Sequence, residues 1–274
     1  DDPVTDTEGL YTGARVGSNA TLNASAAGSV NVSADAELLP VTESLPVLGN
    51  VAVTSFAAGI AGSGNSTAVG GSASINVIEM KTEASVGDGS TVSARDDIDV
   101  SASDRLELFT GAGSLGAAGG GTAVGIGIDV TVAFRDTLAT VGGGASLSSS
   151  LGNVTVDADA DDQHTAVAAS FGLSGGSGAA VSGSIEVAVW DTETRATVQA
   201  GVVDDMSVLS AATGDVSVTA NGDFEMFALA GGVSLGISGS AVGISGIVVV
   251  HSDTVAADLE GFADVMTGGA NGLK

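Results

Sequence analysis

An acidic cluster at Asp157, Asp159, Asp161 and Asp162 is the strongest candidate for binding chemistry in this sequence. Alternate residues of a β-strand share one face, so alternate carboxylates on such a strand would converge. Ca²⁺ prefers six to eight oxygen ligands, and carboxylates supply them. The cluster lacks both the glycine-rich calcium-repeat signature and the EF-hand spacing. Two interpretations therefore stay open: a calcium site, or an acidic edge that only faces solvent.

A second set of residues has the types that β-helical polysaccharide lyases and hydrolases use, namely Asp129, Arg135, Asp136 and His164. Carboxylates that converge with arginine, lysine or histidine in a groove act as general acids and bases. Here the residues form no motif, His251 stands apart, and carboxylates are abundant throughout the chain. The sequence therefore predicts no enzyme, no catalytic residue and no bound cofactor other than calcium.

Short polar residues also precede four related segments: Ser29, Asp97, Asn153 and Asp215. Such side chains are suited to turns. If they align in the fold, stacked like charges would repel, and a cation could offset that repulsion. Turn formation and cation binding are both compatible with the pattern.

The composition limits what kind of molecule can position these residues. The chain has 274 residues with 42 glycines, no cysteine, 3% aromatics and 44% hydrophobic residues. It is too apolar for a disordered protein and poor in the large side chains of a conventional core. Its 33 acidic and 7 basic residues give a net charge of −26, which argues against nucleic-acid binding. No run approaches the roughly 18 apolar residues of a membrane helix, so we expect no membrane span.

A repeat with a Thr-x-Ala core organises the chain. The predicted ladder residues are Thr12, Thr82, Thr137, Thr194 and Thr254, with Ala14, Ala84, Ala139, Ala196 and Ala256. The alanines are 70, 55, 57 and 60 residues apart, and a valine follows two positions later in the first four copies. The residue between threonine and alanine varies freely. In a strand, the constrained columns should face inward and the variable column outward.

Further columns recur at a fixed distance from these anchors. An aliphatic column is predicted at Leu22, Val92, Leu147 and Val208, and a Val-x-Val-x-Ala group begins at Val30, Ile98, Val154 and Val216. Each unit then has a glycine-rich half and a second strand, with a valine seven residues before the anchor alanine at Val77, Val132, Val189 and Val249. We expect equivalent residues to stack in register. Inward threonine, alanine, valine and isoleucine would then form ladders in which small side chains replace a bulky core.

Units of this kind predict an all-β, parallel β-helix-like solenoid of about four degenerate units of roughly 57–60 residues. We expect a single solenoid over 1–274: a partial unit 1–37, units near 38–105, 106–163 and 164–223, and a terminal unit 224–274. The first unit carries 12 or 13 extra residues near 37–49, with two of the three prolines. Proline is poorly tolerated inside a sheet, so this insertion is predicted to be a surface loop, either simply tolerated or a partner contact.

Two structural alternatives stay open. One unit could form one large coil or two to three smaller ones, since a common right-handed β-helix coil has nearer 20 residues. The other alternative to a solenoid is an antiparallel sandwich of long hairpins.

The segment from Ala68 to Asp104 carries a resemblance to known proteins. Its alanine-, glycine- and valine-rich strand, its Thr-Glu-Ala-x-Val-Gly-Asp-Gly turn and its Val-x-Val-x-Ala strand resemble repeats of filamentous-haemagglutinin-like and leukotoxin-type filamentous adhesins. The Thr82 copy matches best, and the Thr194 copy lacks the Gly-Asp-Gly turn. The resemblance, which extends from about Glu8 onward, implies an extracellular β-solenoid at the cell surface, used as a stalk, adhesin or filament.

We therefore expect a structural surface protein that self-associates by end-to-end stacking of its coils. Its predicted partners are identical subunits or adjacent repeats of the same polypeptide, with surface glycans of host or neighbouring cells as a further partner class. The hypothesis from another class is a carbohydrate-binding or carbohydrate-cleaving β-helix. That function would need a groove lined by aromatics or paired carboxylates, for which Trp190 alone is thin support.

Overall fold

The computed structural model describes residues 9–39, 41–45, 49–53, 55–202, 206–261 and 263–268. All regular secondary structure in these residues is β-strand. No helix in this part of the chain is long and apolar enough to cross a membrane.

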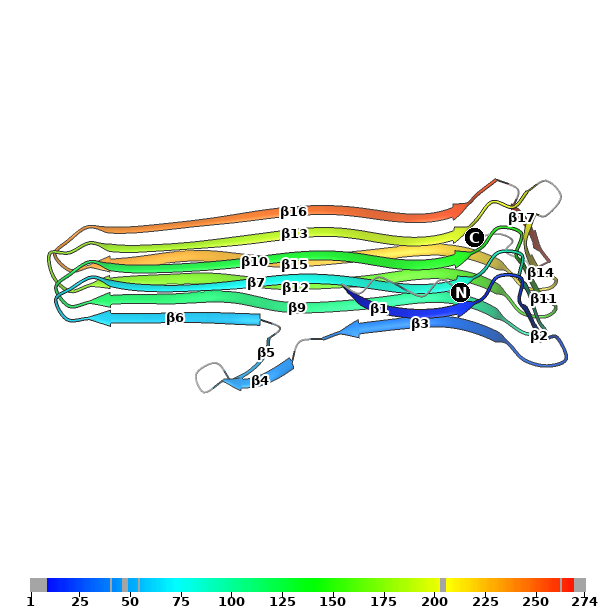
Figure 1. Ribbon diagram of the computed structural model, residues 1–274, viewed down its shortest axis with the longest axis horizontal. Helices are drawn as coiled ribbons and strands as arrows, with labels where there is room; N and C mark the ends of the chain where they lie inside the picture. Colours follow the sequence, from blue (N-terminus) through cyan, green and yellow to red (C-terminus); the bar gives the residue numbers. More distant parts are fainter. Residues whose placement is uncertain are drawn as a thin grey trace.

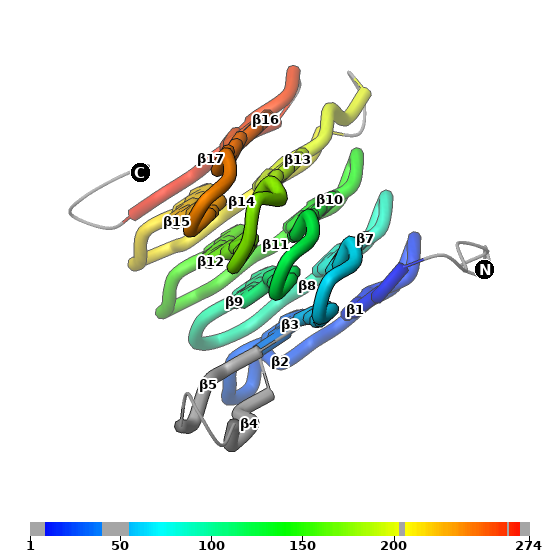
Figure 2. The backbone as a smooth tube through the Cα atoms, turned by 90° about the vertical axis from the view of Figure 1, so that its left-hand side faces the viewer, coloured from blue at the N-terminus to red at the C-terminus, as the bar shows by residue number. Residues whose placement is uncertain are grey.

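Each coil of the fold consists of a long strand, a short strand and a second long strand. In one coil these are β10 (Ala123–Val141), β11 (Ser146–Ser149) and β12 (Val154–Ser174). A tight glycine-rich turn then leads into the first long strand of the next coil, so the coils stack one above the other (Figures 1 and 2). One sequence unit therefore makes one large coil, and the version with several small coils per unit is wrong.

Equivalent strands of successive coils form three sheets. Sheet A contains β1 (Leu10–Val16), β7 (Ala68–Val86), β10, β13 (Ala180–Val198) and β16 (Ala241–Leu259). Sheet B contains β2 (Thr21–Ala24), β8 (Thr91–Ala94), β11, β14 (Ser207–Ala211) and β17 (Ala263–Thr267). Sheet C contains β3 (Val30–Leu38), β6 (Ser55–Ser63), β9 (Ile98–Ala118), β12 and β15 (Val216–Gly236). All pairings in these sheets are parallel. The predicted all-β solenoid is confirmed, and the antiparallel sandwich is wrong.

The long sheets A and C pack face to face, and the short sheet B joins them at one end of the flattened coil (Figure 2). We call the part of sheets A and C next to sheet B the short-sheet half. The turn half is the remainder, next to the glycine-rich turns: 68–78, 123–133, 180–190 and 241–251 in sheet A, and 55–63, 109–118, 165–174 and 227–236 in sheet C.

The predicted anchor columns are confirmed in the three central coils. Thr82, Thr137 and Thr194 pair in register and expose 1% or less of their surface. The alanine and valine columns that follow them are equally buried. Threonine, alanine and valine at alternate positions therefore face the interior, as the strand periodicity predicts.

Three predicted registers are wrong by one residue. Thr194 pairs with Val255 and Ala196 with Ala257, so Thr254 and Ala256 belong to the outward columns. Val189 likewise pairs with Val250, not Val249, and Leu147 pairs with Leu209, not Val208. A one-residue slip moves each side chain to the opposite face. Two neighbouring alanines, Ala256 and Ala257, and a longer β13–β14 connection concealed this slip. It also explains why no valine follows two positions after Ala256: the residue that pairs with Val198 is Leu259.

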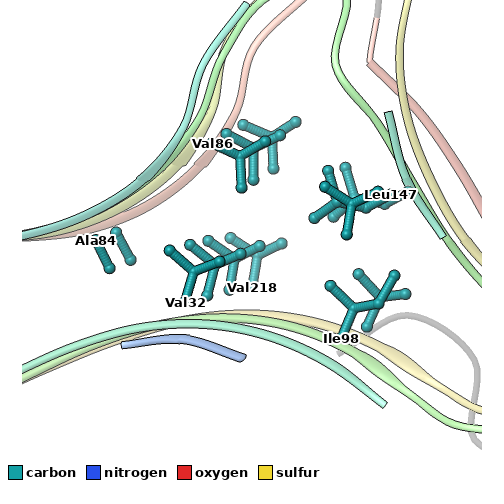
Figure 3. Close-up of a cluster of buried hydrophobic side chains, with 14 of the residues drawn as sticks. Val32, Ala84, Val86, Ile98, Leu147 and Val218 are labelled. Carbon is teal, nitrogen blue, oxygen red and sulfur yellow. The ribbon is translucent and has the colours of Figure 1, made fainter. Parts of the chain in front are cut away.

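The short-sheet half has an apolar interior. Val86 from sheet A, Leu147 from sheet B and Ile98 from sheet C point into one cluster, in which each exposes 1% or less (Figure 3). Val32 and Val218, at opposite ends of one stacked column, belong to the same cluster. Repetition of medium-sized aliphatic side chains thus fills the interior without aromatic residues.

The turn half is built differently, because its two long sheets lie very close together. A Cβ atom on Gly125 of β10 would lie 2.3 Å from the carbonyl oxygen of Phe171 on β12. A Cβ atom on Gly116 of β9 would lie 2.1 Å from the carbonyl oxygen of Val124. Only glycine fits at such positions, and alanine and serine occupy much of the remaining inward surface.

The aliphatic residues of the turn half face outward. The predicted valine column stacks in register at Val77, Val132 and Val189, and it lies on the outer face of sheet A. The reason is parity: seven residues separate each valine from its inward anchor alanine, and an odd separation changes the face of a strand.

The first coil contains the predicted insertion. β3 pairs with residues 98–106 of β9, and β6 pairs with residues 110–118 of the same strand. The insertion is therefore residues 39–54, since the next coil has only residues 107–109 between the equivalent positions. It begins two residues after the start of the predicted range 37–49. Within the insertion, β4 (Val41–Leu45) and β5 (Gly49–Val53) form an antiparallel hairpin outside the three sheets (Figure 1). Pro40 and Pro46 lie outside the described residues.

Candidate functional site

The end of the stack at β16 and β17 carries no covering element among the described residues. β16 pairs only with β13, and its inward-facing Ile247 and Val249 each expose 46% of their surface. Leu259, which stacks on the fully buried Val198, exposes 42%. The interior columns of the solenoid are therefore open at this end, next to an edge of strands that can accept further pairing.

The opposite end is open in a different way. β1 covers only Met80–Val86 of β7, so in the described part of the chain residues 68–79 of β7 have no sheet A partner on that side. Leu10 and Tyr11 at the start of β1 expose 58% and 43%. Both ends of the stack thus present aliphatic columns and free strand edges.

The strand numbers define what an added coil must supply. Sheets A and B each contain five strands, whereas β3 and β6 share one layer of sheet C and leave four layers. A second stack placed on β16 and β17 through its own β1 and β2 would continue sheets A and B. Sheet C would then lack one strand above β15, so a seamless extension requires one further strand there.

The acidic cluster divides between the two faces of β12. Asp157, Asp159 and Asp161 face outward, whereas Asp162 faces inward and exposes 3%. Each outward carboxylate meets a neighbouring coil: Asp157 accepts a hydrogen bond from Thr219, Asp159 accepts one from Asn221 at 2.9 Å, and Asp161 lies 3.6 Å from the Arg105 guanidinium.

The prediction that these four carboxylates converge on one ion is therefore wrong for Asp162. Adjacent residues of a strand point to opposite faces, so the pair Asp161–Asp162 cannot contribute to one site. The described residues contain no group of three or more histidine, cysteine or acidic side chains placed to hold a metal ion. Calcium binding by the outward carboxylates stays a prediction.

The polar turn residues form a ladder along the stack. The Ser29 hydroxyl accepts a hydrogen bond from the backbone N–H of Asp97 at 3.2 Å. The Asp97 carboxylate in turn accepts from the N–H of Asn153 at 2.8 Å, and the Asn153 side-chain oxygen accepts from the N–H of Asp215 at 2.9 Å. Each coil thus satisfies a backbone donor of the next, which gives these residues a structural role in the turn.

An ionic cluster lies between sheets A and C near the middle of the coil. Arg135 of β10 is 2% exposed, and its guanidinium lies 2.6 Å from the Asp104 carboxylate of β9. Arg135 also forms an ion pair with Asp162 of β12. One arginine thereby links three strands of two sheets, and it compensates carboxylates that would otherwise be buried alone.

A second polar chain lies beside this cluster. The Thr110 hydroxyl donates to the Asp129 carboxylate at 2.5 Å and lies 3.0 Å from Nε2 of His164. Since Thr110 has one proton to donate, His164 Nε2 must be the donor in the second contact. Burial lowers the pKa of His164 to about 4, against the opposing effect of the Asp129 charge, so the ring is neutral near pH 7.

Glu186 completes this chain from the neighbouring strand. It pairs in register with Asp129, so two carboxyl groups stack in one interior column. Burial, the adjacent Asp129 charge and a hydrogen bond to Asp129 raise the pKa of Glu186 to about 8. At neutral pH, Glu186 is therefore a protonated carboxylic acid.

The structure brings three of the four residues considered for catalysis into this interior. Asp129, Arg135 and His164 expose 2% or less, whereas Asp136 lies on the outer face of β10. His251 belongs to the terminal coil, where its ring stacks on Phe224 with centroids 4.0 Å apart. The three inward residues are therefore sealed between sheets A and C and are not exposed to a polysaccharide at the surface.

Asp104, Glu186 and the inward position of Trp190 were not predicted from the sequence. Glu186 and Asp129 both lie ten residues before an anchor alanine, and an even separation keeps a residue on the anchor's face. Parity along the strand was thus the signal that could have found them. Trp190 is fully buried against His164 and Phe224, so it does not form a carbohydrate platform.

No family model matches the chain, and neither a curated protein nor a solved structure matches it.

Proposed function

We propose that this chain is a structural β-solenoid, a subunit or segment of an extracellular filament, stalk or adhesin at the cell surface. The observation that carries the proposal is the open stack: the terminal coils leave in-register aliphatic columns and strand edges uncovered in the described residues. Uncapped solenoid ends expose strand edges that can pair with further coils. Identical subunits or adjacent repeats of one polypeptide would supply them.

Two further features support a mechanical role. Parallel ladders run through up to five layers, and the turn residues add hydrogen bonds from coil to coil. The polar residues whose types could bind a metal or act in catalysis are either buried inside the stack or bonded to neighbouring coils. These features suit a stiff rod that holds other parts of a surface structure at a fixed distance. The resemblance to filamentous adhesin repeats is consistent with that role.

Electron microscopy across a concentration series tests self-association at the ends. A lysine at the inward position Ile247 would place a charge between the stacked coils, whereas a lysine at the outward Thr254 of the same strand would not. We expect rods that lengthen with concentration for the wild type and Thr254→Lys, and rods no longer than one stack at all concentrations for Ile247→Lys. Wild-type particles of constant length at all concentrations would contradict end-to-end stacking.

A further inference from the structure

The outer face of sheet A in the turn half is a continuous aliphatic surface, which we call the aliphatic face. Its most exposed members are Val69, Ile75, Val77, Ile126, Ile185, Val242, Ile244, Val248 and Val250, with exposed fractions of 43% to 71%. They come from four adjacent strands, so the side chains form aligned columns across β7, β10, β13 and β16. Contiguous apolar surface of this extent marks an interaction site.

Charge is absent from this surface. The four sheet A segments of the turn half contain only two charged residues, Asp129 and Glu186, and both are fully buried on the inner face. The charges of sheet A's outer face begin in the short-sheet half, with Glu79, Asp136 and Asp191. The outer face of one sheet is therefore divided into an aliphatic part and a mainly acidic part.

The inner face of sheet A is covered by sheet C, whereas no described element covers the aliphatic face. Parallel sheets occur almost only with both faces covered. The face spans four strands about 4.8 Å apart and the 10 residues of 124–133 at about 3.3 Å each, which gives roughly 630 Å². Two such faces would bury about 1,300 Å², within the range of stable protein interfaces.

The outer face of sheet C is less suited to flat packing. Gly113 and Gly231 interrupt its outward columns. An open groove of about 520 Å³, lined by residues that include Leu173, Leu235 and Ile237, lies next to its glycine-rich turns. Sheet A also has outward glycines, at Gly71, Gly183 and Gly246. Most of its other outward residues are β-branched and stack in register, which makes sheet A the better sheet-on-sheet surface.

We propose that the aliphatic face is a lateral interface for a second copy of this chain, packed face to face in antiparallel orientation about a two-fold axis. Two copies have the same strand spacing, so their columns can interdigitate. The antiparallel arrangement brings aliphatic residues together and moves the two acidic parts to opposite ends, whereas a parallel arrangement would stack them against each other. A lipid bilayer is the less suitable occupant, because the free strand edges of the stack would meet hydrocarbon.

Sedimentation of matched variants tests the interface. All variants carry Ile247→Lys, which blocks end-to-end stacking, so that only lateral association is measured. We expect the Ile247→Lys chain to form dimers, and Val187→Asp at the aliphatic face to raise the dissociation constant at least about 30-fold. Val167→Asp on the outer face of sheet C should leave the dimer intact.

The orientation is tested with single cysteines, since the chain has none of its own. Val130→Cys, near the centre of the face, should form an intermolecular disulfide. Thr140→Cys, on the acidic part of the same strand face, should not. A monomeric Ile247→Lys chain, a Val187→Asp dimer as tight as the parent, or efficient Thr140→Cys cross-linking would overturn the proposal. Monomers that bind phosphatidylcholine vesicles would also overturn the proposal if Val187→Asp abolishes that binding.

Discussion

The two halves of each coil share a backbone but distribute their side chains in opposite ways. In the short-sheet half, Val86, Leu147 and Ile98 fill an apolar interior, and the outer faces carry most of the charge. In the turn half, glycine, alanine and serine line the interior, and valine and isoleucine face outward. The ionic cluster around Arg135 lies where these two patterns meet.

The comparison shows that stacking, more than core hydrophobicity, defines this fold. Hydrogen bonds between coils run through both halves without a break, although the interior changes from aliphatic to small and polar. The aliphatic interior provides burial in one half. Close approach of the sheets provides dispersion contacts in the other, together with an outer face suited to a partner.

Breaking the ionic cluster at the junction should have the largest effect on stability. Arg135→Met leaves Asp104 and Asp162 buried without their cation, and we expect a loss of about 3–5 kcal/mol in the free energy of unfolding. Replacing all three residues by aliphatic side chains should recover much of this loss. Chemical denaturation measures both variants, and an unchanged midpoint for Arg135→Met would show that the cluster contributes no net stability.

A glycine exchange tests the close approach of the sheets in the turn half. Gly125→Ala directs a methyl group at a backbone oxygen 2.3 Å away, and we expect a loss of about 1–3 kcal/mol. The outward Gly183 is the matched control: a Cβ there has its nearest neighbour 3.9 Å away, so Gly183→Ala should change stability by less than about 0.5 kcal/mol. Equal losses of stability for Gly125→Ala and Gly183→Ala in thermal unfolding would contradict the close approach of the two sheets at Gly125.

The buried acid pair predicts a pH dependence that an apolar interior would not have. Glu186 keeps its proton up to about pH 8 in the folded chain, whereas its ordinary pKa is 4.5, so the folded state binds more protons in this range. Its contribution to stability is full below pH 4.5 and is lost as the pH rises towards 8.

Glu186→Gln should remove this loss. Between pH 6.5 and 8, the wild type should lose up to about 1.4 kcal/mol per pH unit relative to the variant. His164, whose ordinary pKa is 6.5, contributes equally to both proteins and cancels in the comparison. Denaturation curves at four pH values in this interval measure the two slopes. Parallel slopes would mean that Glu186 is ionised inside the fold.

The smallest effect is expected at the turn ladder of the short-sheet half. Asp97→Ala removes one acceptor for the N–H of Asn153, and we expect a loss of about 1 kcal/mol. Asp97→Asn keeps a side-chain oxygen at the same place and should restore most of that stability. A full loss in both variants would point to the charge of Asp97 as the stabilising feature.

Much of the fold was predictable from the sequence because stacking repeats the same residue at the same place. The columns at Thr82, Thr137 and Thr194 identified both the unit and the inward face. The slip at Thr254 was not avoidable by pattern alone, since Ala256 and Ala257 offer the same residue in two registers. Only backbone pairing along the whole of β16 decides between them.

The interior chemistry was harder to predict. Carboxylates are so frequent in this chain that Glu186 and Asp104 do not stand out by type, and their burial follows from strand parity and from the facing sheet together. The outward aliphatic columns were missed for a related reason. Valine was assumed to face inward, whereas the close approach of the sheets leaves no room for it there.

Hydrogen exchange at two protein concentrations tests the central claim, that this is an open stack extended at its ends, most directly. At low concentration the amides of β1, β16 and β17 should exchange faster than those of the central β10 and β12. At high concentration protection should rise at the terminal strands and stay unchanged in the centre. Terminal strands that exchange at the same rate at both concentrations would contradict extension of the stack by further coils.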